Sequence, residues 1–316
     1  MANFKIAILI IMVSIAALQA QESQKESTKT LIYENNFDSF ADIDDWTIEG
    51  PGRIYLTENK MMVIPDAQQY VYRKWEDCGR RVLDGKTEYY AAVKEGLEKT
   101  NPGMLKKMYD ENDNIAGGHI VCWNKAFETA GDYCVEYDFK PLSPIGLGII
   151  FFSAKGCNGS DVLSDRLKER NGIFSQYLKV DTNSYHISYW ANNAAVGKRG
   201  TCNLRKNKGA FCLANGIDPS VKNLDYSKKT FEYETYRISL QKVKNNIKFS
   251  IDGQVVIDYT DNRYNNIVAE EGLDTVKQKN VDTGEVLEGG RIGLRQMVGL
   301  IGQYDNFKVY NITAAD

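Results

Sequence analysis

Residues suited to acid–base chemistry and to anion binding gather in the middle of the chain. His186 lies among tyrosines in the run 184–190, and Arg205 lies in the basic, amide-rich run 198–208. Strand side chains alternate between two faces, so His186 and Trp190 are expected on one face of a strand. An imidazole and a guanidinium on neighbouring strands could hold an anionic sugar. The same alternation is typical of well-packed aromatic sheet, so both interpretations stay open from the pattern alone.

Charge and the first residues limit the class of protein. The chain has 316 residues and a net charge of −3, which argues against general nucleic-acid binding. Residues 1–20 carry Lys5 and then an apolar run, 6–18, which is typical of a secretory signal peptide and too short for an ordinary membrane anchor. We therefore expect an exported protein, periplasmic or secreted, with a flexible leader at 21–30 and no membrane span.

The cysteines and histidines constrain metal and disulfide chemistry. Six cysteines in an exported chain permit disulfides, and Cys202 with Cys212 is the pair we expect because the two flank a short loop. No Cys or His spacing resembles a zinc site, and the two histidines exclude a site built of several histidines. Asp305 and Asn306 are candidates for a structural calcium site, with an ordinary turn or strand contact as the alternative.

Hydrophobic alternation and turn signals predict an all-β fold over 31–316 in a single domain. The run 146–154 is continuously apolar and predicts a central strand that is covered on both sides. Asp252–Gly253 predicts a hairpin, and 260–288 reads as a long polar loop. Residues 76–118 have helical propensity and predict a helical insertion. The other predicted strands are 46–49, two short strands around 57–60, 133–140, 174–180, 184–190, 236–240, 247–251, 255–259 and 304–309.

Several short segments run in order from Trp46 to Val309 and are specific as a set. They are Trp46 with Glu49–Gly50–Pro51, His119 with Trp123, 148–154, Arg170–Asn171–Gly172, 185–189, 203–207, 293–297 and 304–307. Together these segments resemble the YesU-like family of carbohydrate-utilisation proteins. The resemblance implies a concanavalin A-like β-jelly-roll sandwich with a ligand cleft on its concave side, from which this chain departs by its insertion.

The resemblance also implies a function. The family resembles proteins that break down acidic, rhamnose-containing polysaccharides such as ulvan or rhamnogalacturonan, and some relatives resemble dehydratases that remove water from a terminal uronic acid. That reaction needs cations to neutralise the sugar carboxylate, a base and a proton donor. On this interpretation the candidate catalytic residues are His119, His186, Tyr177 and Arg205, and the candidate substrate-binding residues are Trp123, Trp190, Asn203, Lys206, Arg295 and Gln296. No cofactor is expected.

Other functions fit parts of the same sequence. A non-catalytic glycan-binding module needs only stacking rings and amides, and a polysaccharide lyase would use the same proton abstraction. Retaining glycoside hydrolysis would need two carboxylates, for which Glu136 and Asp138 are the candidates. Each histidine, tyrosine and tryptophan named above is also explained by packing alone. The fold does not decide between these functions.

Overall fold

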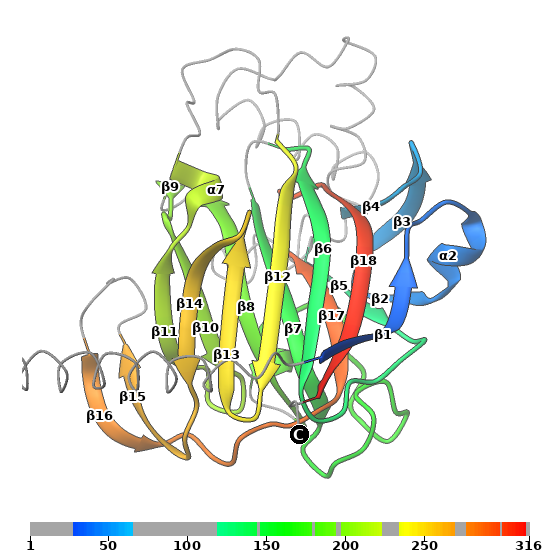
Figure 1. The fold of residues 1–316 in the computed structure, drawn as a ribbon. Coiled ribbons are helices and arrows are strands. Elements are labelled where there is room, and N and C mark those ends of the chain that lie inside the picture. Colours follow the sequence, from blue (N-terminus) through cyan, green and yellow to red (C-terminus); the bar gives the residue numbers. More distant parts are fainter. Residues whose placement is uncertain are drawn as a thin grey trace, which may run out of the picture.

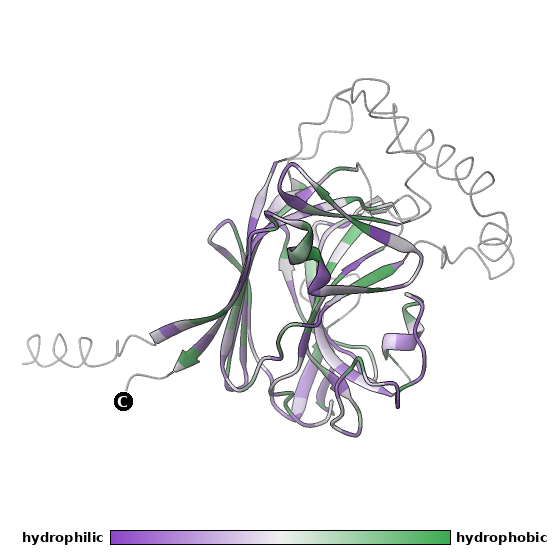
Figure 2. Cartoon of the chain, turned by 90° about the vertical axis from the view of Figure 1, so that its right-hand side faces the viewer, coloured by the Kyte–Doolittle hydropathy of each residue, from purple (hydrophilic) through white to green (hydrophobic). Residues whose placement is uncertain are grey.

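Two antiparallel sheets pack face to face, seen from the front in Figure 1 and edge-on in Figure 2. The expected all-β sandwich is confirmed in this computed structural model. Its helices, within the part of the chain that is described, are four or five residues long: α2 (Phe40–Asp44), α6 (Ser175–Leu178) and α7 (Pro219–Lys222). The structure describes residues 28–65, 119–143, 146–178, 181–193, 197–222, 234–268, 276–297 and 299–313. The predicted helical insertion at 76–118 lies outside these residues.

The front layer in Figure 1, called sheet A here, has the strand order β14-β13-β12-β6-β18-β4-β3, and β1 also pairs with β18. In β12 buried and half-exposed residues alternate strictly, as expected of a strand with one face on a core and one near water. Its strands are β1 (Thr28–Asn35), β3 (Gly52–Thr57), β4 (Lys60–Pro65), β6 (Tyr133–Pro141), β12 (Tyr236–Val243), β13 (Asn246–Ile251), β14 (Gln254–Thr260) and β18 (Gly302–Thr313).

The rear layer, sheet B, has the order β11-β10-β8-β7-β17-β5-β2, with β9 beside β8. The predicted central strand is confirmed: β7 is buried on both faces along nearly its whole length. Sheet B must therefore be covered on the side that faces away from sheet A. Its strands are β2 (Trp46–Glu49), β5 (Ile120–Asn124), β7 (Gly146–Gly156), β8 (Thr182–Asn193), β9 (Gly197–Lys198), β10 (Thr201–Lys206), β11 (Phe211–Ile217) and β17 (Arg291–Gln296).

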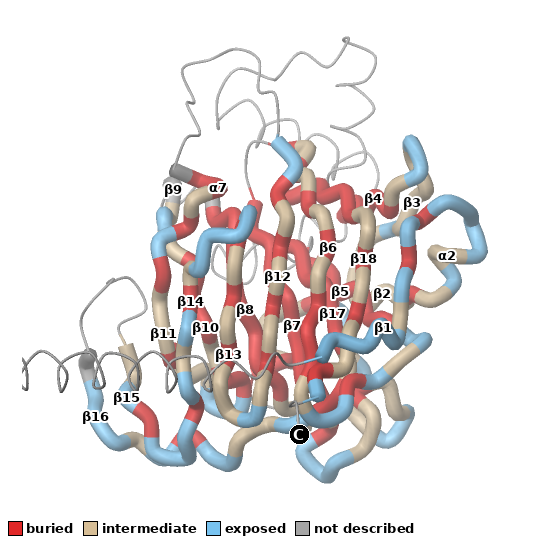
Figure 3. The backbone as a smooth tube through the Cα atoms, in the orientation of Figure 1, coloured by how far each residue is buried: buried red, intermediate tan, exposed pale blue. Residues whose placement is uncertain are grey.

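Apolar and aromatic side chains from both sheets fill the space between the layers. Tyr137 of sheet A donates a hydrogen bond of 2.9 Å to Tyr189 of sheet B in the middle of this core. Pairing the two phenols satisfies groups that would be costly to bury alone. Figure 3 shows the buried strand centres in red, with exposed residues concentrated at the strand ends, in the loops and along the edge strands.

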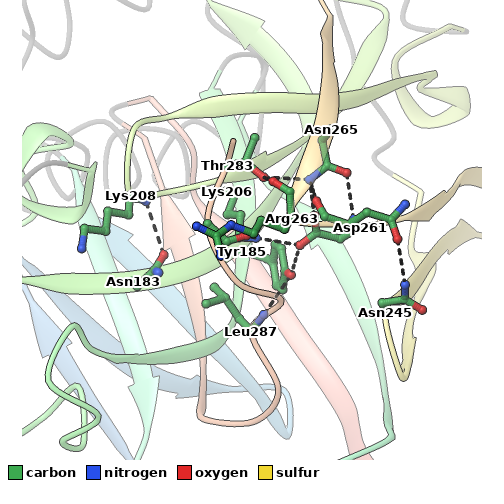
Figure 4. Close-up of polar contacts among 12 residues, drawn as sticks. Asn183, Tyr185, Lys206, Lys208, Asn245, Asp261, Arg263, Asn265, Thr283 and Leu287 are labelled. Carbon is green, nitrogen blue, oxygen red and sulfur yellow. Dashed lines mark hydrogen bonds and ion pairs between the residues drawn. The ribbon is translucent and has the colours of Figure 1, made fainter. Parts of the chain in front are cut away.

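A separate two-stranded hairpin lies beyond the sandwich edge, where the sequence predicted only a loop. β15 (Tyr264–Val268) pairs with β16 (Val276–Asp282). A buried cluster ties the start of this hairpin to sheet B, as Figure 4 shows. Lys206 Nζ lies 2.8 Å from Asp261 Oδ2 and donates to the carbonyl of Gly284 at 2.9 Å. The hydroxyl of Tyr185 also donates to Asp261, so the buried carboxylate is compensated.

Two further expectations are wrong. The strand predicted at 174–180 does not form over 174–178: α6 occupies Ser175–Leu178, because this segment crosses over sheet B instead of joining it. Residues 179 and 180 lie outside the described part of the chain. Cys202 and Cys212 are both free thiols. In the β10–β11 ladder Cys202 is opposite Gly216 and Cys212 is opposite Arg205. The two cysteines are thus three positions out of register, roughly 10 Å along the strands, which is too far for a disulfide.

Candidate functional site

The candidate site lies on the outer face of sheet B, the face turned away from sheet A. Arg205 on β10 is directly opposite His186 on β8, and His186 is in turn opposite Phe151 on β7. One strand further, Arg295 on β17 is opposite Ile149 of β7 and Val121 of β5. The predicted proximity of His186 and Arg205 is confirmed, because alternation places both on one face of neighbouring strands.

The segment that ends in α6 covers this face. The Arg295 guanidinium carbon lies 4.7 Å from the centre of the Phe174 ring and 5.8 Å from that of Tyr177. Phe174 also makes an edge contact with His186 at 5.8 Å, and Tyr177 stacks on Phe151 at 5.6 Å. His186 and Arg295 are therefore buried beneath this segment, outside the core between the sheets.

Two glycines allow this cover to approach the sheet closely. Gly50 and Gly172 have φ values of 104° and 92°, in the left-handed region that favours glycine. A Cβ atom at Gly172 would lie 1.8 Å from the carbonyl oxygen of His119, and one at Gly50 would lie 2.4 Å from it. The turn at Gly172, the turn at Gly50 and the start of β5 thus meet at one point, beside the site.

An ion pair holds the same junction together. Arg170 Nη2 lies 2.5 Å from Glu49 Oε1, and Nε lies 3.1 Å from Oε2. The hydroxyl of Tyr177 donates to Glu49 Oε2 at 2.7 Å. Burial, and then the negative charge of Glu49, raise the pKa of Tyr177 above its ordinary value. Tyr177 therefore stays protonated at neutral pH.

Arg295 is a buried cation of this face with no counter-ion among the residues that the structure describes. Its side chain is 0 % exposed, yet within this part of the chain its one hydrogen bond runs from Nη2 to the carbonyl of Gly172, at 3.0 Å. Nε and Nη1 have no partner within the described residues, and neither has Nε1 of Trp123 on the same face. Burial lowers the pKa of Arg295 to about 10. Unpaired donors on a buried charge are costly, and a bound anion would satisfy them.

The electrostatics of His186 fit a neutral base. Nδ1 lies 2.6 Å from Oδ1 of Asn207, whose Nδ2 donates to Ser184 Oγ at 2.6 Å. With the amide in this orientation Nδ1 carries the proton, which leaves Nε2 unprotonated. Burial, and then the positive charges of Arg205, Arg295 and Arg199, hold the pKa of His186 well below its ordinary value. Burial and Arg295 do the same for His119.

Three predicted site residues lie on the wrong face. Lys206 points inward to Asp261, and the side chain of Gln296 meets the hydroxyl of Tyr304 in the core between the sheets. Both follow a residue of the outer face by one position, so alternation turns them inward. Trp190 also packs in that core: its φ of 50° breaks the alternation of β8 and turns the ring away from the face of His186.

The remaining predicted residues lie on or beside the outer face. His119, Tyr177, His186 and Arg295 come together there, and Asn203 is on the face of Arg205. Trp123 is buried against Phe151 at 5.6 Å, which is a packing arrangement. Sequence reasoning missed Glu49, Arg170 and Phe174 as parts of the site. The segments Glu49–Gly50 and Arg170–Asn171–Gly172 carried a signal, since a charged residue beside glycine in each marks a tight, polar turn.

Residues 80–309 match the family described as "Domain of unknown function (DUF1961)". The chain belongs to this family. It is 27% identical over 281 residues to the uncharacterized protein YesU of Bacillus subtilis (strain 168), covering 88% of this chain and 94% of that protein. The resemblance to YesU-like proteins is thereby confirmed.

A solved structure has the same fold. The crystal structure of a protein of unknown function with a galectin-like fold, from Bacillus subtilis, superposes with a TM-score of 0.63 and 24% sequence identity. The match covers 91% of this chain and 99% of that one. This chain therefore has a galectin-like, concanavalin-like sandwich, and the likeness concerns the fold alone.

Other predicted sites are occupied by structural contacts. Glu136 pairs with Lys29 at 2.9 Å and with Arg237 at 3.1 Å, and Asp138 also pairs with Arg237. Burial raises the pKa of Glu136, but Lys29 and Arg237 outweigh burial and hold it below the ordinary value, which does not suit a catalytic acid.

The calcium candidates also have protein partners. Asp305 lies 3.4 Å from Lys60, and Asn306 donates to Asp138 at 2.7 Å. Within the described ranges, no group of three acidic, cysteine or histidine side chains is placed to hold a metal. Nor does any helix in these ranges have the length and apolar character needed to cross a membrane.

Proposed function

We propose that the outer face of sheet B binds the carboxylate of an acidic sugar, and that the protein eliminates water from a terminal uronic acid of an acidic oligosaccharide. One observation carries this proposal: Arg295 is fully buried with two unpartnered donor nitrogens and no counter-ion among the described residues. A planar guanidinium matches a carboxylate with two parallel hydrogen bonds. Burial strengthens such a pair by excluding water.

The reaction requires a base beside that carboxylate. The hydrogen on C5 of a uronic acid is weakly acidic, and its removal places negative charge on the carboxylate. His186 Nε2 takes this proton, the C5–H electron pair forms the C4=C5 double bond, and the C4–O bond breaks. The pKa of His186 is lowered, so its imidazole is free to accept a proton at neutral pH. Arg205, opposite His186, adds positive charge for the substrate.

The departing hydroxyl must receive a proton to leave as water. Tyr177 suits this role better than the role of base, because its raised pKa keeps the phenol protonated. Its ring lies 5.8 Å from the Arg295 guanidinium carbon, which keeps the hydroxyl near the bound carboxylate. Glu49 accepts the hydrogen bond from the single proton of this phenol, so the hydroxyl rotates about its C–O bond to donate that proton to the departing hydroxyl when substrate binds. His119 is the second candidate base on this face, because burial and Arg295 lower its pKa and keep its imidazole neutral.

The family resemblance supports the substrate class. Acidic, rhamnose-containing oligosaccharides of the ulvan or rhamnogalacturonan type combine a uronate with neutral sugars. The expected signal peptide at 1–20 would place the reaction outside the cytoplasm. A polysaccharide lyase would use the same C5 proton but would expel a sugar from C4 in place of a hydroxyl. The two reactions differ in product: dehydration leaves one product that is lighter by one water.

The test is turnover of uronate-terminated oligosaccharides, followed by the ultraviolet absorbance of the new double bond and by mass spectrometry. His186→Gln should lower turnover about a hundredfold or more, since it removes the base while keeping a polar side chain of similar size. Glu136→Gln, a carboxylate change on sheet A, is the matched control and should retain turnover.

Two other outcomes would replace this proposal. Turnover that survives in His186→Gln and is lost in Glu136→Gln would indicate hydrolysis on sheet A. Binding of the oligosaccharide with no double bond formed would indicate a glycan-binding module.

A further inference from the structure

A separate pocket opens at the far edge of the sandwich, away from β17. It has a volume of about 440 Å³ and lies between β11, β14 and the β15–β16 hairpin. None of its lining residues, all within the described part of the chain, carries a charge. Amides and tyrosine rings dominate its wall. The polar residues of this wall include Tyr259, Thr260, Asn262, Tyr264, Asn266 and Asn280.

We propose that this pocket is a binding site for a neutral sugar unit. Asparagine side chains each offer donors and an acceptor, which match the alternating donor and acceptor capacity of sugar hydroxyls. The Arg263 guanidinium carbon lies over one face of the Tyr264 ring, 5.5 Å from its centre. The residue is still 54% exposed, so the other face of the ring is the one that can pack against the C–H groups of a pyranose. A pocket with no charged wall has no means of neutralising a carboxylate or sulfate, so a neutral unit fits its chemistry.

The base of the pocket is rigid, which is what a binding site requires. Asn265 is 3% exposed and uses its whole amide: Nδ2 donates to Asp261 at 2.5 Å and to Thr283 at 2.7 Å, while Oδ1 accepts from the Tyr259 hydroxyl at 3.0 Å. The backbone N–H of Asn262 also donates to Oδ1, at 2.8 Å. These bonds fix the positions of Tyr259 and Asn262 before any ligand arrives.

The ion pair of Figure 4 anchors this base to the sandwich. Asp261 joins Asn265 on one side to Lys206 on the other, and both charged groups are buried. A buried pair with these additional hydrogen bonds holds one geometry. Lys206, predicted as a direct sugar ligand, thus acts at a distance: it positions the pocket wall through Asp261. Preorganisation of this kind lowers the cost of ordering a site on binding.

The pocket shares no residue with the Arg295 site, so the proposal does not depend on the elimination reaction. By itself, the pocket is a second contact site for a glycan chain. If the elimination reaction also occurs, the protein contacts an acidic end of a polysaccharide at the Arg295 site and a neutral sugar unit of the same polysaccharide class at this pocket. The two sites can therefore be tested separately.

The experiment is saturation-transfer NMR of the full-length protein with neutral methyl glycosides of glucose, galactose, xylose and rhamnose as the probes. We expect at least one to bind the unaltered protein, and Tyr264→Ala and Asn266→Ala each to weaken binding about five- to tenfold. Tyr264→Phe keeps the ring and should retain most of the affinity. Arg295→Met alters the other site and should leave these probes unaffected.

Each outcome decides the matter. Tyr264 and Asn266 are exposed, so far-UV circular dichroism should confirm that the variants are folded. Absence of binding by all four glycosides, or equal binding by Tyr264→Ala and Asn266→Ala, would overturn the proposal. Neutral-glycoside binding by a protein that never turns over uronate-terminated oligosaccharides would support this site while removing the proposed reaction.

Discussion

Two arginines on the same face of β17 have opposite surroundings. Arg291 meets the Asp161 carboxylate at 2.6 Å and donates to the backbone carbonyls of Asn124, Lys125 and Phe127. Arg295, further along the strand, has one carbonyl and no carboxylate in the described structure. Asp161 raises the pKa of Arg291, whereas burial lowers that of Arg295. The hydrogen-bond donors of Arg291 are thus satisfied within the protein, whereas Arg295 has donors in the described structure that a bound anion could satisfy.

The difference matters because an uncompensated buried charge works against folding. A buried guanidinium without a partner costs several kcal/mol in desolvation, and the faces of Phe174 and Tyr177 return only part of it. Aromatic faces attract a cation, but they leave the N–H groups at its edge unbonded. A protein that retains this arrangement gives up stability at a place where an anion can restore it, as is common at binding sites.

The largest effect is expected from Arg295→Met. The substitution keeps a long side chain but removes the group that meets the substrate carboxylate, so turnover of uronate-terminated oligosaccharides should fall about a hundredfold or more. Thermal unfolding should show a free energy of unfolding that is unchanged or higher by about 1–4 kcal/mol, because a buried unpaired charge is gone. A large loss of stability would mean that Arg295 is structural, and the contrast with Arg291 would disappear.

Arg291→Met is the matched substitution and should have the reverse effect. It leaves Asp161 and three carbonyls without their donor, so unfolding should require about 1–3 kcal/mol less, while turnover by the folded protein stays near normal. Arg291 holds the pKa of Asp161 below its ordinary value. The stability difference from the unaltered protein should therefore be complete at neutral pH and shrink as the pH falls through the folded pKa of Asp161. A difference independent of pH would argue against this pair.

The sequence predicted the faces of strands well because alternation is a local property. Tyr185, Ile187 and Tyr189 point into the core and His186 points out, as expected. The same rule would have turned Lys206 and Gln296 inward, had it been applied to them. Only the orientation of Trp190 could not be predicted from alternation, because a pattern of residue types does not reveal its left-handed backbone conformation.

The cover of the site could not be predicted in the same way. Glu49 and Arg170 are distant in the sequence, and the residues around each of them do not indicate that the two form an ion pair. The segment 174–180 has the alternation of a strand, yet Ser175–Leu178 within it fold as the short helix α6. The ring of Phe174, directly before this helix, lies over Arg295 and His186. Contacts between distant segments decide both cases. The hairpin at 264–282 was missed for a related reason, since its polar residues are recruited by the buried Asp261.

A change in the pKa of His186 is the smallest of the expected effects. It is also the one that separates the roles of Arg291 and Arg295 most sharply. Burial, and then the positive charges of Arg205, Arg295 and Arg199, hold this pKa down, so a bound sugar carboxylate should raise it by about one unit or more. Because binding then takes up a proton, affinity for the acidic sugar should increase as the pH falls from the bound toward the free pKa. Heteronuclear NMR of the imidazole, with and without a uronate-terminated oligosaccharide, measures the shift directly. In Arg291→Met the shift should persist and in Arg295→Met it should vanish; a ligand that leaves the imidazole unaffected in the unaltered protein would place the acidic sugar elsewhere.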